Sequence, residues 1–578
     1  MTMHRREFLK LMAASASATA LPLVGNLGCA TKLGGSSTPV SGSSSPISFS
    51  ASDWDAVVKE GWGTVGDAAG PGTWDGVSLK SPGIPGLAGD GPFTADWQSL
   101  LQYDVPEWYQ DAKFGIWAHW SPQCVPEDGD WYARKMYIQG GKQYANHLQQ
   151  YGHPSVAGYK DLCAQWTLLN WEPEALMERY KRAGARLFLA LANHHDGFDA
   201  WNSKYHAWNS VNLGPRKDVL GTWAAAARQQ GLRFGVTVHA ARNWWWFQVA
   251  HLFDKTGPKA GVPYDGSLTA EAGAGQWWQG FDPQQLYGRK HGVNENPDDA
   301  YVRNFYNRVR DLMDQQDPDL LYFDNGGLPL GWAGMNIAAY FYNHNLKTRN
   351  GKMEAVLNIK QVPDSHAKAV VADYERGVTD LIKPYAWQSE TCIGDWHYNR
   401  KRLLQHSYMN PGQAIHWMVD TVSKNGTFIL NIPGKPDGTI DADEEAIVDA
   451  IGNWLQINGE AIYATRPWKT FGEGAHEVKG GAFSGRSTGQ LDARDIRFTR
   501  NKRGDVIYAI VLGWPEDDSF VIKNLGTASP WQPGAAKNVE LLGRHEKLEW
   551  KQTPESLTVK KPAEKPCDFA CALKISFA

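Results

Sequence analysis

The chain has 578 residues, enough for two folded domains and an N-terminal appendage. Its formal net charge is −4 at pH 7, and its 58 Lys and Arg residues are spread along the sequence, which excludes the concentrated basic surface of a nucleic-acid-binding protein. Six cysteines in a chain of this length exclude a disulfide framework.

Tryptophan is unusually abundant, with 27 residues. Several tryptophans stand among polar residues, as in "WNSKYHAWN" (201–209) and "RNWWWF" (242–247). Aromatic faces stack well on the apolar C–H faces of sugars, although a large barrel also buries tryptophan as packing. The surplus favours a carbohydrate site. Near the C-terminus, Cys567 and Cys571 are compatible either with a local disulfide or with two free thiols.

The N-terminus has the pattern of an export signal. Paired arginines in "HRREFLK" (4–10) precede a short apolar run rich in Ala and Ser, which is typical of a twin-arginine signal and too short for a membrane span. We expect a signal over residues 1–30 and a Ser/Thr-rich linker over 31–50, with ordered structure from about Trp54. The expected location is the periplasm or the medium.

Cys29 offers an alternative ending for this signal. The segment "NLGC" (26–29) is a poor lipobox, because Asn26 stands where Leu is usual. Cleavage near Cys29 or Ala30 would release the protein, whereas lipidation of Cys29 would tether it to a membrane. We favour release and keep the lipoprotein as the alternative.

Residues 54–460 predict a (β/α)₈-like barrel, in the α/β fold class. Eight short runs rich in β-formers alternate with helical patterns, as expected for parallel strands. Residues 172–184, 222–231 and 443–459 are among the predicted helices. The predicted strands lie at 113–120, 185–197, 232–240, 319–327, 354–360, 369–377, 386–391 and 426–434. Several strands end in polar residues, so we expect a site at their carboxyl ends.

The pattern changes after the helix predicted at 443–459. From about residue 463 the chain consists of short strand-like runs separated by turns, such as "VIYAIVLGW" (506–514). This pattern predicts a C-terminal antiparallel β-sandwich over 463–578.

A metal site is one chemistry that the histidines at the barrel mouth would allow. His119, His195 and His239 could converge there, but the adjacent His194 and His195 would face opposite sides of a strand. No H-x-H or H-E-x-x-H spacing is present. We therefore expect neither a metal ion nor a cofactor.

A pair of carboxylates is the second option. Asp324 follows the apolar run "LYF", and Glu390 lies in "WQSETC" at the end of another predicted strand. Two carboxyl groups about 5 Å apart serve retaining glycoside hydrolysis, one as nucleophile and the other as acid and base. An aspartate after an apolar strand is equally often a loop cap, so these residues alone leave both readings open.

Several collinear segments resemble the α-L-fucosidases of glycoside hydrolase family 29, over residues 107–468. They are "WYQDAKFGIWAHWSPQCVP", "AGARLFLALANHHDGFDAWNSKYHAWN", "LLYFDNGG", "WQSETCIGDWHYN", "MVDTVSKNGTFILNIPGKPDGTI" and "IGNWLQINGEAIYATRPW". The resemblance implies a (β/α)₈-like barrel with a C-terminal β-sandwich, a retaining mechanism and a carbohydrate substrate.

The resemblance also implies roles for individual residues. Asp324 matches the nucleophile, and Glu390 matches a position often assigned as acid/base, with Glu375 as the alternative. The remaining matches concern sugar binding: His119, His194 and His195 to the sugar hydroxyls, Trp131 at the border of the pocket, and Arg376 near the ring.

Two departures from the family pattern bear on the sugar. His239 ends a strand where a small polar or aromatic environment is usual, and Asp130 stands where Glu is usual. We expect an exo-acting retaining α-L-fucosidase. An α-L-galactosidase, or a hydrolase of modified algal-type fucosides, is the alternative, since an added polar group suits a 6-hydroxyl or a charged substituent.

Two other classes compete with a retaining hydrolase. A non-catalytic sugar-binding relative would bind without turnover, and a metal-dependent hydrolase would lose activity with chelators. The retained Asp324 argues against the first, and the missing ligand spacing argues against the second. The Trp- and Gly-rich insertion at 255–301 is expected to shape the side of the leaving group.

Overall fold

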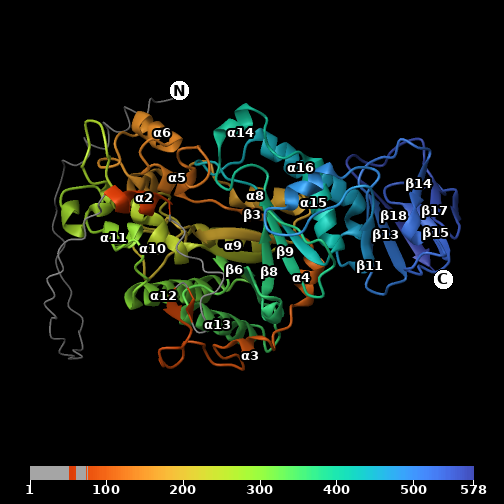
Figure 1. The fold of residues 1–578 in the computed structure, drawn as a ribbon, viewed down its shortest axis with the longest axis horizontal. Coiled ribbons are helices and arrows are strands. Elements are labelled where there is room, and N and C mark those ends of the chain that lie inside the picture. The colour runs from red at the N-terminus through yellow and green to blue at the C-terminus, as the bar shows by residue number, and fades with distance from the viewer. Residues whose placement is uncertain (1–50, 60–72, 75, 578) are drawn as a thin grey trace. The chain divides into compact units, whose positions relative to one another are not determined.

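The computed structural model describes residues 51–59, 73–74 and 76–577 (Figure 1). The export signal predicted at 1–30, the linker at 31–50 and the lipidation position Cys29 lie outside these residues. Within them, no helix has both the length and the apolar character needed to cross a membrane.

Eight parallel strands close into a barrel, as predicted. The closed order is β10-β3-β4-β5-β6-β7-β8-β9, so the last strand pairs with the first. The strands are β3 (Phe114–Ala118), β4 (Leu187–Asn193), β5 (Arg233–Val238), β6 (Leu320–Gly326), β7 (Val356–Lys360), β8 (Val371–Glu375), β9 (Trp387–Cys392) and β10 (Gly426–Asn431). Each lies within or overlaps one of the predicted runs.

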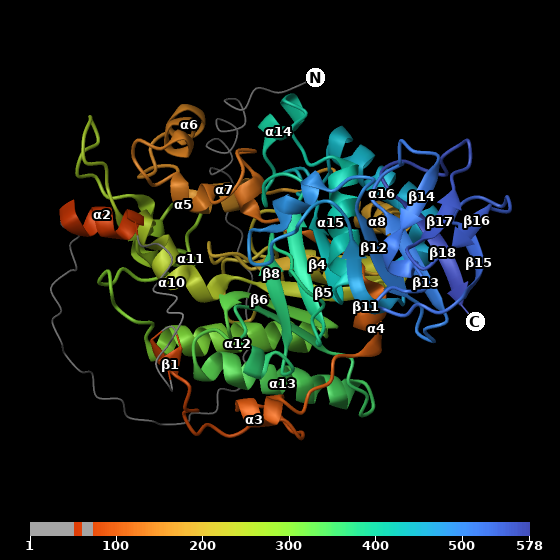
Figure 2. The ribbon, with the colours of Figure 1, turned by 45° about the vertical axis from the view of Figure 1, so that its right-hand side comes forward.

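The long helices form on the barrel's outer side. They are α8 (Pro173–Arg182), α9 (Val219–Gln229), α12 (Asp299–Gln316), α13 (Trp332–Thr348), α15 (Pro411–Ser423) and α16 (Ala442–Asn458). Figure 2 shows α12 and α13 side by side along one flank. Helix α9 begins three residues before its predicted start, because the Asp218 side chain accepts a hydrogen bond from Gly221 N and caps the helix there.

The barrel is less regular between β7 and β9. The connection from β7 to β8 holds one 3₁₀ turn, η6 (Asp364–His366), and the connection from β8 to β9 holds no helix; all residues of both connections are described. The fold is therefore barrel-like with an incomplete helical ring, and the turn after β8 is free to contact other parts of the chain.

Shorter elements complete the described part of the chain. The helices are α2 (Ala51–Lys59), α3 (Trp97–Leu100), α4 (Glu107–Ala112), α5 (Tyr132–Lys135), α6 (Lys142–Gln150), α7 (Tyr159–Gln165), α10 (Asn243–Trp246), α11 (Pro283–Tyr287) and α14 (Arg400–Leu404), and the strands are β1 (Thr73–Trp74) and β2 (Val77–Ser78). The other 3₁₀ turns are η1 (Pro122–Cys124), η2 (Ala240–Arg242), η3 (Phe247–His251), η4 (Asp265–Ser267), η5 (Ala270–Gly273), η7 (Gly459–Ala461), η8 (Gly485–Gln490) and η9 (Lys523–Leu525).

Large side chains fill the barrel interior. Buried residues of several strands pack together there, among them Trp117, Leu189, Leu320, Tyr322 and Ile429. Glycine at 115 makes room for this layer, since a Cβ there would lie 2.7 Å from Leu187 and 2.8 Å from Ile429. The interior is thus a packed core with a site at one end.

The C-terminal residues form two antiparallel sheets, as predicted. One sheet has the order β11-β12-β13-β18-β15 and the other β14-β17-β16. Their buried faces share one apolar cluster, so the sheets pack as a sandwich. The strands are β11 (Arg466–Glu473), β12 (Ile496–Arg500), β13 (Val506–Val511), β14 (Ser519–Ile522), β15 (Ala536–Leu541), β16 (Trp550–Gln552), β17 (Leu557–Lys560) and β18 (Cys571–Phe577). Cys567 and Cys571 are free thiols.

Candidate active site

A cavity of about 560 Å³ opens at the carboxyl ends of the barrel strands. We call it the first cavity. Seven of the eight strands supply one of its polar side chains from the strand end or the residues just beyond it. Its lining comprises Trp117, His119, Trp131, His194, His195, His239, Arg242, Tyr322, Asp324, Gly326, Lys360, Gln361, Glu375, Glu390, Trp396, His397 and Phe483.

Asp324 lies at a break in β6. The pairing of β6 with β7 shifts register between Phe323 and Gly326, which lets the Asp324 side chain face the cavity. Its carboxylate contacts the Lys360 ammonium and lies 3.3 Å from His195 Nε2. Burial alone would raise the pKa of Asp324, but Lys360, His239 and His195 hold it well below the ordinary value. Asp324 is therefore ionised at neutral pH.

Lys360 ends β7 and joins three carboxyl groups. Besides Asp324, its Nζ lies 2.6 Å from Glu375 Oε2 and 3.9 Å from Glu390 Oε1. Burial opposes its charge, but these carboxylates, Asp324 first, raise the pKa of Lys360 well above its ordinary value. Because one ammonium contacts both Asp324 and Glu375, their carboxyl groups are close enough for the roughly 5–5.5 Å separation of retaining glycosidases.

Glu375 and Glu390 occupy different environments. The Glu375 side chain, at the end of β8, is 23% exposed, whereas that of Glu390, in β9, is 1% exposed. The Tyr322 hydroxyl lies 3.4 Å from Glu390 Oε1, and Oε2 of Glu390 has no partner among the described residues. Burial first, and the Asp373 carboxylate second, raise the pKa of Glu390 well above its ordinary value.

Five buried histidines converge around the cavity: His119, His194, His195, His239 and His397. Burial lowers the pKa of His239 and of His397 to about 3, and holds those of His119 and His194 well below the ordinary value. The expectation that His194 and His195 face opposite sides is not met, because β4 ends at Asn193 and both rings lie beyond the strand.

The hydrogen bonds fix the protons of two of these rings. Gln123 Nε2 lies 2.8 Å from His194 Nδ1, so this nitrogen accepts and the proton of the neutral ring lies on Nε2. His195 has an acceptor at each nitrogen, the His239 carbonyl at 2.7 Å from Nδ1 and the Asp324 carboxylate at Nε2. Both bonds form only when both nitrogens of His195 carry protons.

A second cavity, of about 1030 Å³, adjoins the first. The two share Trp131, Glu375, Trp396 and Phe483 in their linings. The structure places Arg376 in the second cavity rather than the first, together with Asp130. Asp130 accepts a hydrogen bond from the His397 backbone N at 2.8 Å, and burial raises its pKa to about 6.

The sequence-predicted residues therefore divide into two groups. His119, Trp131, His194, His195, His239, Asp324 and Glu390 meet at the first cavity, and Arg376 lies apart from them. Sequence reasoning missed Lys360 and His397. Lys360 could have been found, because it is the last residue of a predicted strand and Asp324 was found near the end of another. No residue of the insertion at 255–301 lines either cavity, although all of it is described.

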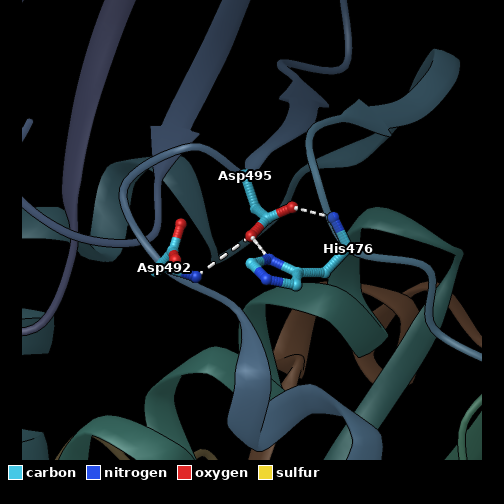
Figure 3. A group of neighbouring side chains, drawn as sticks. All are labelled: His476, Asp492 and Asp495. Carbon is cyan, nitrogen blue, oxygen red and sulfur yellow. Dashed lines mark hydrogen bonds and ion pairs between the residues drawn. The ribbon is translucent and has the colours of Figure 1, made fainter.

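One group of side chains in the described part of the chain has the spacing of a metal site: His476, Asp492 and Asp495 (Figure 3). It lies between β11 and β12, outside both cavities. Asp495 already accepts from the His476 ring at 2.7 Å and from the Asp492 backbone N at 3.0 Å. The Arg494 guanidinium bonds Asp492 at 2.6 Å, so a cation would have to displace it. These contacts give the group a local structural role.

Comparison with known sequences agrees with this geometry. The sequence profile described as alpha-L-fucosidase matches residues 87–460, and that described as alpha-L-fucosidase C-terminal domain matches residues 491–576. The chain belongs to the α-L-fucosidase family, glycoside hydrolase family 29. It is a glycosidase of that family, and the two matches coincide with the barrel and the sandwich.

Individual relatives of this family are similar to the chain over most of its length. Tissue alpha-L-fucosidase of Mus musculus is 27% identical over 498 residues, covering 84% of this chain and 94% of the relative. The human tissue enzyme is 27% identical, with 84% and 92% covered. Among solved structures, Thermotoga maritima alpha-fucosidase in complex with fucose superposes with a TM-score of 0.62 at 25% identity, covering 84% of this chain and all of that one.

Proposed function

We propose that this fucosidase family member is an exo-acting retaining hydrolase that releases α-L-fucose from glycans through a glycosyl-enzyme intermediate. The observation that carries the proposal is the meeting of Asp324 and Glu375 on the one ammonium of Lys360, in a cavity lined by five buried histidines. An ionised carboxylate and a second carboxyl group at this spacing suit double displacement.

In the first step, an ionised Asp324 oxygen forms a bond to the anomeric carbon as the bond to the leaving oxygen breaks. A proton from the acid goes to that oxygen. In the second step, the residue that served as the acid takes a proton from water. The water oxygen attacks the anomeric carbon, and the bond to Asp324 breaks. Two inversions retain the configuration. Lys360 and His195 keep Asp324 ionised and positioned between turnovers.

The acid and base role falls to one of two glutamates, and position favours Glu375. A general acid has to reach the leaving oxygen. Glu375 lines both cavities and is 23% exposed, whereas Glu390 is 1% exposed and lies against Tyr322. Because its pKa is raised, Glu390 would carry a proton that it could donate. Glu390, which the family resemblance indicates, is therefore the alternative. We propose Glu375 as the acid and base because it lies where the leaving oxygen can accept its proton.

The histidines are proposed to hold the sugar. A neutral imidazole donates from one nitrogen and accepts at the other, which suits the paired donors and acceptors of sugar hydroxyls. Both ring nitrogens of His119 and Nδ1 of His239 are buried without a partner among the described residues. Sugar hydroxyls would satisfy these atoms, whose burial is otherwise unfavourable.

His239 favours one second candidate, hydrolysis of α-L-galactosides. L-Galactose differs from L-fucose by a 6-hydroxyl, and the unpartnered Nδ1 of His239 could bond such a group. A modified fucoside with a polar substituent at this place would use the same atom.

The test is release of 4-nitrophenol from the α-L-fucoside and the α-L-galactoside, by the wild type and by Asp324→Asn. Turnover of the fucoside that falls at least about 10³-fold in the variant, with the sugar still bound, supports the proposal. Unchanged turnover in Asp324→Asn would refute the assignment of Asp324 as the nucleophile. Preference for the galactoside would select the second candidate, and binding without turnover in the wild type would indicate a non-catalytic sugar-binding relative.

We also propose that the protein is exported by its twin-arginine signal. The support is the pattern of residues 4–10 and the family's carbohydrate chemistry. Fractionation of cells that express the full chain tests it: the mature protein is expected in the periplasm or medium, and replacement of both arginines by lysine is expected to retain it inside. Recovery in the membrane fraction that depends on Cys29 would indicate the lipoprotein alternative.

A further inference from the structure

We propose that the second cavity binds an anionic sugar residue on the leaving-group side, so that the preferred substrates carry a sulfate ester or a carboxylate next to the terminal fucose. This inference rests on the proposed function. Glu375 lines both cavities whereas Asp324 lines only the first, so the bond to be broken lies at their junction. The fucose occupies the first cavity and the leaving group enters the second.

Four cationic side chains from separate segments line the second cavity. They are Lys135 of α5, Arg376 after β8, Arg402 of α14, and Arg486 of η8. The chain positions span more than three hundred residues, so the fold, and not a local run of basic residues, brings them together. A cluster of this kind creates a positive potential inside a concave surface.

The acidic residues of the cavity offset this cluster only in part, because four cationic side chains stand against two carboxyl groups in the lining. Its two carboxyl groups are Asp130, bonded to the His397 backbone, and Glu375, bonded to Lys360 of the first cavity. Of the four cations, Arg402 is paired with Asp395 at 2.8 Å. Within the described part of the chain, Lys135, Arg376 and Arg486 have no carboxylate at ion-pair distance. Lys135 instead donates to the Asp130 backbone carbonyl at 3.1 Å.

Arg376 is the best positioned of these cations. Its backbone is in the left-handed region at φ 45° and is held on both sides, because Arg376 N donates to the Glu390 carbonyl at 2.7 Å and Gly485 N donates to the Arg376 carbonyl at 2.9 Å. Its guanidinium lies 5.1 Å from the Trp396 ring and contacts the Cys392 thiol at 2.9 Å. A planar guanidinium pairs with sulfate or carboxylate oxygens through two parallel bonds.

The size and remaining lining suit a sugar. A volume of about 1030 Å³ lies at the upper end of ordinary small-molecule sites, which is enough for at least one monosaccharide. Trp131 and Phe483 stand at the junction of the cavities, and Phe483 is 64% exposed, so an aromatic face is available for stacking. Polar and apolar contacts of this kind together recognise a charged sugar ring.

The experiment compares matched disaccharides with the same linkage. One pair is α-L-fucosyl-fucose with and without a sulfate on the reducing residue, and the other is α-L-fucosyl-galactose against α-L-fucosyl-galacturonate. The kcat/KM of each anionic member is expected to exceed that of its neutral partner by about tenfold at low ionic strength, and the advantage is expected to shrink as salt rises to about 0.5 M. The two pairs show whether sulfate or carboxylate is preferred.

Variants assign the effect to the cavity. The double variant Lys135→Gln/Arg486→Gln is expected to lower the ratio of anionic to neutral kcat/KM about three- to tenfold. Arg376→Gln is expected to bring the ratio of anionic to neutral kcat/KM close to one, whatever the absolute rates. Arg503→Gln, at an exposed arginine outside both cavities, is the matched control and should change neither ratio.

The outcomes separate this inference from the proposed function. If the wild type hydrolyses the nitrophenyl fucoside but treats both members of each pair alike, the anionic preference is overturned and the fucosidase activity stands. If the wild type hydrolyses none of the fucosides, the proposed function fails. Titration of the same pairs into Asp324→Asn still decides the preference in that case, since equal affinity for anionic and neutral members overturns it.

Discussion

Lys360 lies among the carboxyl groups that we propose to react. Asp324 and Glu375 both contact its ammonium, and a third carboxyl group, that of Glu390, lies at the edge of its reach. Two nearby carboxylates would normally share a proton, because like charges disfavour each other's ionised forms. The buried ammonium offsets this repulsion for Asp324, whereas Glu390 and Asp373 remain protonated more readily, with the pKa of Asp373 raised to about 7.

At this scale the pH profile is predicted to depend on Lys360. The pKa of Asp324 is held low, so the wild type should keep its nucleophile ionised well below neutral pH. Lys360→Gln removes the main cation, the pKa of Asp324 rises, and the acidic limb of kcat/KM should move upward by about one pH unit or more.

The control for this prediction is Lys479→Gln, at an exposed lysine outside both cavities. Its profile of kcat/KM against pH should match the wild type. An acidic limb that stays in place in Lys360→Gln would show that Lys360 does not set the charge of the nucleophile.

A second residue-scale prediction distinguishes the two glutamates. Glu375→Ala should lower kcat on substrates with poor leaving groups by about 10²–10⁴-fold, because the leaving oxygen is no longer protonated. Azide should restore turnover of the nitrophenyl fucoside and yield the fucosyl azide, since a small anion replaces the missing base at the intermediate. Glu390→Ala is expected to lose activity without rescue, because its site is buried. Rescue of Glu390→Ala alone would reverse the assignment.

Among the structural elements, α12 holds the segment that carries His194 and His195. Arg308 of α12 bonds Asp199 through Nε at 3.0 Å and the Gly197 carbonyl through an amino group at 2.9 Å, and both charged side chains are buried. Asn193, the last residue of β4, also donates to Asp199, at 2.9 Å. The buried Arg308–Asp199 pair thus ties the loop after β4 to α12.

We expect Arg308→Met to destabilise the protein by about 3–5 kcal/mol, because it leaves the Asp199 carboxylate buried without its cation. The matched control is Arg310→Met on the same helix, whose guanidinium lies at the surface side and should cost about 1 kcal/mol or less. Urea unfolding measures both. Equal losses in the two variants would contradict the role given to the buried pair.

In the molecule as a whole, the sandwich is bound to the barrel by a buried ionic cluster. Asp420 of α15 lies 2.8 Å from Lys424 Nζ and 2.7 Å from Arg497 Nε of β12, and all three side chains are buried. Burial would raise the pKa of Asp420, but Lys424 and Arg497 hold it below its ordinary value. Its contribution to stability is therefore present above the unfolded-state pKa and is lost as the pH falls through the folded-state pKa.

Arg497→Met is expected to destabilise the whole chain by about 3–5 kcal/mol and to separate the unfolding of the two domains, since it leaves Asp420 with one cation. Lys502→Met tests an exposed pair across the same junction, where Lys502 contacts Glu107 at 2.7 Å, and should cost about 1 kcal/mol or less. Calorimetry that finds one unchanged transition in Arg497→Met would refute the coupling.

The segment between β11 and β12 also reaches the barrel mouth. Phe483 N donates to the Glu375 carbonyl at 2.8 Å, and Gly481 N donates to the Val378 carbonyl at 2.8 Å. Phe483 thereby enters the lining of both cavities from beyond the barrel's last helix. Residues after the barrel thus line the cavities of the proposed active site, and the turn after β8 is available to them because no helix covers it.

The sequence by itself determined the eight strands, the sandwich and most of the polar residues at the barrel mouth. Hydrophobic runs that end in polar residues are local signals, and the carboxyl ends of parallel barrel strands lie at one face. The order of the strands along the chain therefore sufficed to place His119, His239 and Asp324 together.

Only the tertiary structure decided the finer arrangement. Three features depend on side-chain direction and on contacts across hundreds of residues. Lys360 joins three carboxyl groups, Arg376 lies in the second cavity, and Phe483 returns to the site. Such contacts leave no local pattern, because a lysine at a strand end or an arginine in a turn has the same sequence signal wherever it points. The division of the site into two cavities follows from these contacts alone.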